Sequence, residues 1–124
     1  MKKIILTTIL ILSSSLFANT GEKIAKQNGC MECHNIMGKK LAPAFMGIAK
    51  KNMKWFGNNA KEKIIESIKN GSKGKYRNFI NTEMPSYKHL PNNDLDMIAS
   101  WILTQYNKNK KLYLNGKQNN QGGK

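Results

Sequence analysis

Several residue types are scarce in this chain. Its 124 residues include only two cysteines, two histidines, three prolines and seven acidic side chains, against 21 lysines and arginines. Arg77 is the single arginine, which disfavours specific nucleic-acid recognition, because base edges are read mostly through the bidentate guanidinium fork. No segment shows the strict alternation of a half-buried strand. The sequence therefore predicts a small, basic, all-α protein with one folded domain.

The first 18 residues have the pattern of a secretory signal. Lys2 and Lys3 precede an apolar run over residues 4–12, which serines and Ala18 follow. The run is shorter than the roughly 20 residues of a membrane span, so we expect export to the periplasm with cleavage after Ala18, although an uncleaved anchor is the alternative. The rest would keep 19 of the 21 cations and all seven acids, a formal charge of +12. This charge suits weak contact with acidic proteins or an anionic membrane surface.

Four short helices are predicted in a domain over residues 19–106. They cover residues 19–28, 44–51, 59–70 and 92–106. Asn19 and Asn59 each stand three residues before a glutamate, as in a capping box. Residues 71–91 contain two glycines and two prolines without a sustained period, and are expected to form a long ordered loop. Residues 107–124, rich in Asn, Lys, Gln and Gly, are expected to form a mobile basic tail.

The two cysteines belong to one motif. Cys30, Cys33 and His34 form the Cys-x-x-Cys-His pattern of covalent haem attachment. The thiols stand about one helical turn apart, so both can reach one haem edge, and His34 follows at once to bind the iron. A zinc site would need two further ligands, whereas only one other histidine remains, and a thioredoxin-type pair would need a strand–helix context. We therefore expect one haem c, with its iron, per chain.

Several side chains are candidates for the second iron ligand. Met84 lies in the long loop, next to Pro85 and far from Cys30, so its thioether can reach the distal haem face. His89 is the rival ligand. The other methionines are too close to the attachment motif or, like Met97, fit a packing role; they are Met31, Met37, Met46, Met53 and Met97.

These motifs in this order resemble the small bacterial class I c-type cytochromes. The resemblance covers residues 21–106 and rests on the Cys-Met-Glu-Cys-His segment, Pro43, the segment Ile-Lys-Asn-Gly-Ser-Lys-Gly over 68–74, Met84-Pro85 and the last helix with Trp101. Two positions depart from the pattern. Ala42 replaces the usual glycine before Pro43, and Ser67 stands where an arginine is often found near a haem propionate, so Arg77 or a lysine would take that role.

The resemblance implies a set of roles. Cys30 and Cys33 would form the thioethers, His34 would be the proximal ligand, and Met84 the distal ligand. The backbone at Pro43 would accept the His34 ring N–H. Two further implications are that Tyr76 contacts a propionate and that the Gly29 region and Trp101 bring the first and last helices together.

The function implied is electron transfer and not catalysis. A monomeric carrier would take single electrons from a quinol-oxidising complex and pass them to a terminal oxidase, a peroxidase or another reductase. The alternative is a ligand-binding haem protein, sensory or peroxidase-like, with an open sixth position.

Overall fold

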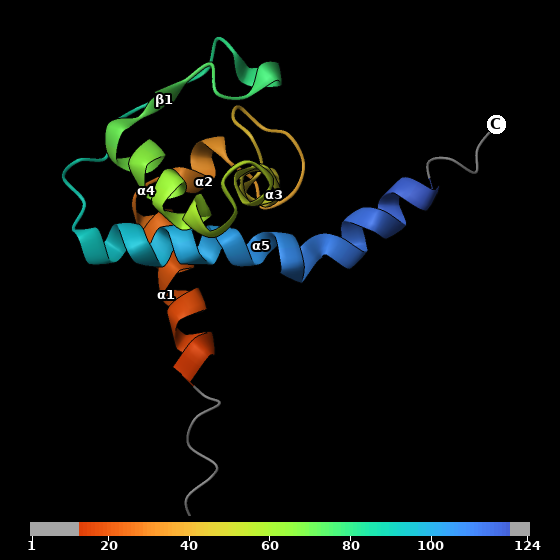
Figure 1. Cartoon of the computed structure of the whole chain (residues 1–124), viewed down its shortest axis with the longest axis horizontal. Coiled ribbons are helices and arrows are strands. Elements are labelled where there is room, and N and C mark those ends of the chain that lie inside the picture. Colours follow the sequence, from red (N-terminus) through yellow and green to blue (C-terminus); the bar gives the residue numbers. More distant parts are fainter. Residues whose placement is uncertain (1–12, 120–124) are drawn as a thin grey trace, which may run out of the picture.

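The computed structural model describes residues 13–119. The helices are α1 (Ser13–Gln27), α2 (Cys30–Cys33), α3 (Phe45–Phe56), α4 (Ala60–Asn70) and α5 (Asn92–Asn119), with 3-10 turns η1 (Gly57–Asn59) and η2 (Arg77–Phe79) and strands β1 (Ser72–Lys73) and β2 (Glu83–Met84). Helix α5 is the longest element, and α1, α3 and α4 all pack against it (Figure 1). The predicted all-α class is confirmed.

The crossing of α1 and α5 depends on a glycine. A Cβ on Gly21 would stand 2.6 Å from the Cβ of Trp101, and closer still to the carbonyl oxygen of Met97. Only a residue without a side chain lets the two helices approach this closely. The sequence-based expectation that the Gly29 region makes this contact is wrong. Gly29 instead ends α1 and leads into α2, in the left-handed conformation with φ 73°.

The core lies between α5 and the helices that cover it. The predicted stripe on α5 is buried, with Leu95, Ile98 and Ile102 at most 3% exposed. Trp101 and Phe45 pack ring to ring, with centroids 4.9 Å apart in an edge-on arrangement. The remaining apolar members of this core come from α1, α3, α4 and α5: Ala25, Ala49, Ile64, Ile68 and Ala99.

Neither predicted capping box forms. Helix α1 begins at Ser13, so Asn19 lies within the helix. Asn59 does stand at the N-cap of α4, but it is also the last residue of η1. Its backbone, at φ −90° and ψ 8°, is therefore away from the extended conformation that aims a capping side chain. Its side chain makes no capping hydrogen bond.

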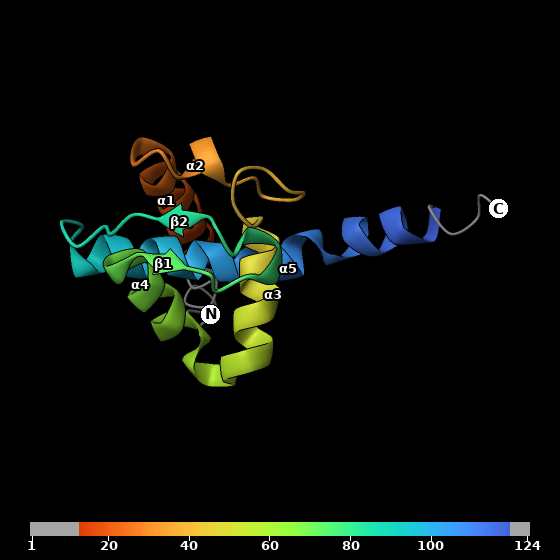
Figure 2. The same cartoon turned by 90° about the horizontal axis from the view of Figure 1, so that it is seen from above.

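The segment between α4 and α5 is more regular than expected. Strands β1 and β2 pair antiparallel, with Ser72 opposite Met84 and Lys73 opposite Glu83, and η2 lies between them (Figure 2). The expectation that the chain holds no strand is therefore wrong. Strands of two residues are too short for alternation to reveal them.

The last helix is longer than predicted. It does not end near Tyr106 but continues to Asn119, so most of the predicted tail is helical, and this part projects beyond the other elements (Figure 1). Residues 107–115 contain no Gly or Pro to stop the helix. The side chain of Asn109 also bonds back to the carbonyl of Gln105, at 2.9 Å.

The predicted leader is only partly covered by the structure. Residues 1–12 lie outside the described part, and the expected cleavage point after Ala18 falls within α1. From residue 13 to residue 119, no helix has both the length and the apolar character that a membrane crossing requires.

Candidate functional site

The attachment motif folds as a single helical turn. Gly29 turns the chain out of α1, and α2 then consists of Cys30–Cys33 alone. His34 leaves this turn in an extended conformation, with φ −111° and ψ 133°, while its N–H still donates to the carbonyl of Cys30. One turn thus carries both thiols and then directs the imidazole away from the helix.

Three constraints position the His34 ring. Its Nδ1 lies 2.6 Å from the carbonyl oxygen of Pro43. The ring also stacks on Phe45, with centroids 4.9 Å apart, and the residue is only 8% exposed. Because a carbonyl oxygen can only accept, Nδ1 carries the hydrogen and Nε2 keeps its lone pair. Burial lowers the pKa of His34, which favours this neutral form.

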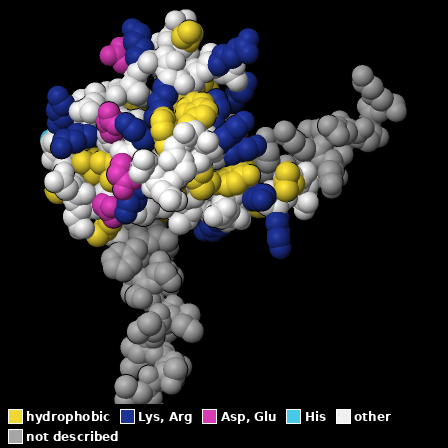
Figure 3. All heavy atoms as spheres, viewed as in Figure 1, with side chains coloured by type: hydrophobic (Ala, Val, Ile, Leu, Met, Phe, Trp, Pro, Cys, Tyr) yellow, Lys and Arg dark blue, Asp and Glu magenta, His cyan; other side chains and the backbone are white. Residues whose placement is uncertain are grey.

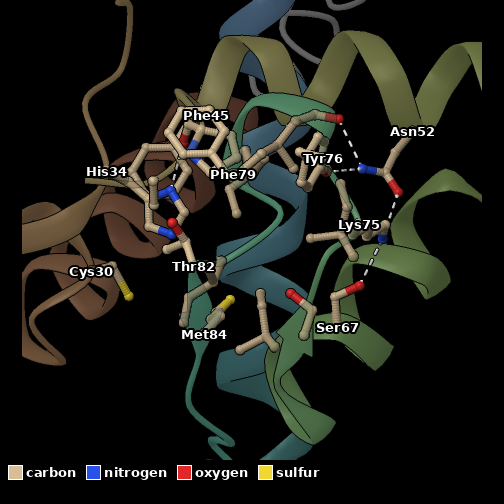
Figure 4. A pocket seen from close by; sticks show the side chains of 18 of the residues that line it. Cys30, His34, Phe45, Asn52, Ser67, Lys75, Tyr76, Phe79, Thr82 and Met84 are labelled. Atoms are coloured by element: carbon tan, nitrogen blue, oxygen red, sulfur yellow. Dashed lines mark hydrogen bonds between the residues drawn. The ribbon is translucent and has the colours of Figure 1, made fainter. Parts of the chain in front are cut away.

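His34 faces an apolar cavity between α3, α4, α5 and the β1–β2 segment. The empty space in and around the cavity amounts to about 720 Å³, a figure that includes solvent at its open mouth. Most of its wall is aliphatic or aromatic, and Figure 4 shows His34, Phe45 and Met84 around it. Cys30 also lines the cavity, and burial raises the pKa of its thiol. Cys33 does not line it and is exposed.

Met84 reaches the cavity from β2. Of the methionines in the described part of the chain, it alone lines the cavity. Two hydrogen bonds tie its loop to the end of α4: Ser86 Oγ donates to the carbonyl of Lys69 at 2.7 Å, and the N–H of Tyr87 donates to the carbonyl of Ile68 at 3.0 Å. His89 is not among the lining residues; its ring lies against Tyr87, with centroids 5.8 Å apart.

A polar corner closes the cavity beside α3. Asn52 is fully buried and donates to the Tyr76 hydroxyl at 3.1 Å, while Lys75 Nζ donates to Ser67 Oγ at 2.8 Å and to Asn52 Oδ1 at 3.4 Å (Figure 4). Burial raises the pKa of Tyr76 and lowers that of Lys75. Lys75 therefore presents a half-buried ammonium group to this corner. The sequence analysis expected either Arg77 or a lysine, without naming which one, in the role of the usual arginine.

Sequence reasoning missed Asn52 and did not single out Lys75. Asn52 falls seven residues after Phe45 on the buried face of α3, so an amide on an apolar stripe was the available signal. The position of Lys75 depends on how the chain turns after β1, and no local pattern indicates that turn. Of the predicted site residues, the cavity brings together Cys30, His34, Pro43, Tyr76 and Met84.

This donor set fits a covalently attached haem. The cavity is lined by the His34 imidazole, whose Nε2 is free, and by the Met84 thioether. It is also lined by the Cys30 thiol, with the Cys33 thiol one helical turn away, and by the Lys75 ammonium group, which could pair with acidic substituents of a cofactor. Histidine and methionine are a common pair of iron ligands in cytochromes c. Among the described residues, no group of three or more His, Cys, Asp or Glu side chains is placed to hold a metal ion, so the four ligands of a structural zinc site are not assembled there.

Comparison with known proteins points to the same cofactor. A family model described as cytochrome c matches residues 18–105. Cytochrome c-552 of Hydrogenobacter thermophilus is 34% identical over 105 residues, which cover 84% of this chain and 98% of that protein. Cytochrome c-551 of Pseudomonas aeruginosa is 30% identical over 101 residues, covering 82% and 91%.

A solved structure agrees with these sequence matches. The crystal structure of wild-type Nitrosomonas europaea cytochrome c552 is similar with a TM-score of 0.60 at 31% identity, and the match covers 68% of this chain and 98% of that one. The family match ends at residue 105, whereas α5 continues to Asn119. The similarity therefore covers the part that bears the cavity.

Proposed function

The chain belongs to the cytochrome c family, whose members bind one covalently attached haem c with its iron, and on this premise we propose that it carries single electrons between two redox proteins. The protein would transfer electrons without catalysing a reaction of its own. When bound, the haem iron supplies the chemistry by alternating between the ferric and ferrous states. The protein's part is to hold that iron with the same two ligands in both states.

We assign the site residues as follows. Cys30 and Cys33 would form the thioether links to the haem, and His34 Nε2 and the Met84 thioether would bind its iron. The observation that carries this assignment is that His34 and Met84, from distant segments, line one apolar cavity, with Nε2 left free by the hydrogen bond to Pro43. A metal-bound histidine whose other nitrogen donates to a carbonyl has a fixed tautomer and ring orientation.

The surrounding residues serve the same purpose. Phe45 and the aliphatic side chains exclude water from the ligands, which with a thioether ligand favours the ferrous state and a higher potential. Tyr76 and Lys75 stand at the polar corner, where a hydroxyl and an ammonium group can hold haem propionates. Tyr76 therefore keeps the propionate contact that the sequence suggested, as part of this proposal.

Location and partners follow from the leader and the charge. The signal-like first 18 residues favour the periplasm, and the formal charge of +12 on the remainder favours acidic partners. We propose a monomer that receives electrons from a quinol-oxidising complex and delivers them to a terminal oxidase, peroxidase or other reductase. Residues 19–106 form the electron-carrying domain in this proposal.

Optical spectra of the purified holoprotein test the ligand assignment. A His/Met haem should show the near-infrared charge-transfer band in the ferric state, and the ferrous state should not bind carbon monoxide. Immediate binding of carbon monoxide, or of cyanide to the ferric form, would contradict the assignment. That result would favour the alternative, a ligand-binding haem protein with an open sixth position.

A further inference from the structure

The end of α3 exposes a large aromatic side chain. Trp55 is 46% exposed, although it stands on a helix whose other face lies in the core. Its ring lies 6.0 Å from that of Tyr76, centroid to centroid, at an interplanar angle of 30°. Tryptophan is enriched among the anchors of protein interfaces.

The rings of Trp55 and Tyr76 connect this surface to the cavity. Tyr76 lines the cavity, and Asn52 holds its hydroxyl at 3.1 Å, so the ring has a fixed position. Trp55 lies on the outer side of the Tyr76 ring. Two aromatic rings in sequence therefore lead from the haem cavity to solvent.

Two exposed lysines of α3, Lys51 and Lys54, precede Trp55 in the sequence, and Lys51 lies over its ring. Lys51 Nζ lies 5.6 Å from the Trp55 centroid and 5.0 Å from that of Tyr76. Lys51 and Lys54 are both exposed, and within residues 13–119 neither forms an ion pair with a carboxylate; the four ion pairs found there use Lys26, Lys61, Lys63 and Lys73. In the view of Figure 1, Figure 3 shows exposed hydrophobic side chains in the upper part of the molecule, with basic side chains on either side of them.

We propose that the face formed by Lys51, Lys54, Trp55 and Tyr76, here called the Trp55 face, docks the acidic surface of a one-electron redox protein. The inference rests on the proposed function, because it assumes a haem in the cavity. Carboxylates of the partner would meet Lys51 and Lys54, and Trp55 would be the apolar anchor. One electron passes between the haem iron and the partner's own metal centre, so that one metal is oxidised while the other is reduced. The rings of Trp55 and Tyr76 are neither oxidised nor reduced.

The docking is tested by nuclear magnetic resonance on the ¹⁵N-labelled ferrous holoprotein. Hexacyanochromate(III), a paramagnetic trianion, should broaden the Trp55 indole N–H and the amides of Lys51 and Lys54, while diamagnetic hexacyanocobaltate(III) should not broaden them. Lys51→Glu with Lys54→Glu should abolish this broadening. The matched control, Lys108→Glu with Lys111→Glu, makes the same charge change on α5 and should leave it in place.

Broadening centred elsewhere, or broadening of Trp55 that survives the double reversal, would overturn the proposal. The Lys51 contact with the two rings would then be a structural cation–π contact only. The optical spectrum and reduction potential of the same sample are read first. These measurements can show a His/Met haem that takes up one electron. In that case, broadening by hexacyanochromate centred away from Trp55 overturns docking at the Trp55 face and leaves the proposed function intact.

The contribution of the ring is tested separately by the rate of oxidation with ferricyanide. Trp55→Ala should lower the second-order rate several-fold without changing the reduction potential, and Trp55→Phe should restore most of the loss. A purely structural role would instead shift the thermal unfolding midpoint while leaving the rate unchanged. An unchanged rate in Trp55→Ala would overturn the role of Trp55 as the anchor of this face.

Discussion

The carbonyl oxygen of Met84 lies 2.6 Å from the point where a Cβ on Gly71 would stand. Gly71 ends α4 with φ 75° and ψ 172°, a conformation open almost only to glycine. The strand that carries Met84 therefore passes directly over the end of α4. Met84 can take its position in the cavity because Gly71, 13 positions earlier, has no side chain.

Gly71→Ala should displace the Met84 segment. The new methyl group cannot share space with the Met84 carbonyl, and the backbone strain alone costs about 1–3 kcal/mol. We expect a weaker near-infrared charge-transfer band in the ferric holoprotein, a lower reduction potential and a lower unfolding midpoint. Gly57→Ala is the matched control, since Gly57 also has a positive φ, of 52°, but nothing lies within 4 Å of its Cβ position. That variant should lose stability while keeping the band.

Gly21→Ala should weaken the crossing of α1 and α5. The added methyl would overlap the Cβ of Trp101, 2.6 Å away, and overpacking of this kind costs about 1–3 kcal/mol. Gly47→Ala is the control: Gly47 also lies within a helix, yet nothing stands within 4 Å of its Cβ position, so alanine should be neutral or stabilising by up to about 1 kcal/mol. Denaturant unfolding of the holoproteins measures both, and equal effects would contradict the close-crossing argument.

The sequence was most informative where the chemistry is local. Cys30, Cys33 and His34 are adjacent in one motif, so their spacing alone predicts one helical turn followed by an imidazole. Met84 required an argument by elimination, and the structure places it, alone among the described methionines, at the cavity. The polar corner was less accessible, because Asn52 and Lys75 come from segments 23 positions apart that meet only in the fold.

In the fold, too, the sequence predicted some features and missed others. Apolar periodicity located the buried face of α5, because packing follows the stripe. It could not identify Gly21 as the crossing point, since a glycine within a helix carries no sign of what approaches it. It also placed the end of α5 too early: the fall in apolar content after Tyr106 marks where packing ends, whereas lysines and asparagines allow the helix to continue.

Changing both cysteines should abolish the holoprotein. Cys30 and Cys33 are the only thiols in the chain, so Cys30→Ala with Cys33→Ala leaves no group for a thioether. Each single variant should retain haem by one link at a reduced yield. Acid–organic extraction followed by mass spectrometry measures the attached haem. Haem that stays on the double variant after extraction would exclude this motif as the attachment site.

Met84→Ala should open the sixth coordination position. The thioether is lost and no other methionine of the described part lines the cavity to replace it, so the ferrous protein should bind carbon monoxide and the potential should fall. Met97→Leu conserves volume and should change neither property. His89→Ala tests the rival ligand and should leave the spectrum unchanged. Loss of the native spectrum in His89→Ala, with the band intact in Met84→Ala, would reverse the assignment.

Electron transfer with an anionic partner should slow as salt is added. A formal charge of +14 on the whole chain, or +12 without the first 18 residues, attracts an anion over a distance set by the Debye length. That length falls from about 30 Å at 0.01 M salt to about 3 Å at 1 M, and electrostatic attraction can raise association rates by about 10- to 10³-fold. The second-order rate of oxidation by ferricyanide should therefore drop steeply across this range.

The sign of the effect should reverse for a cationic oxidant such as tris(phenanthroline)cobalt(III). Salt then screens a repulsion, so the rate should rise. Stopped-flow measurement of both reactions on the same ferrous sample separates attraction from a general effect of salt on the protein, because such an effect would move both rates the same way. Two rates that fall together, or that both stay flat, would mean that the lysines do not steer the redox partner.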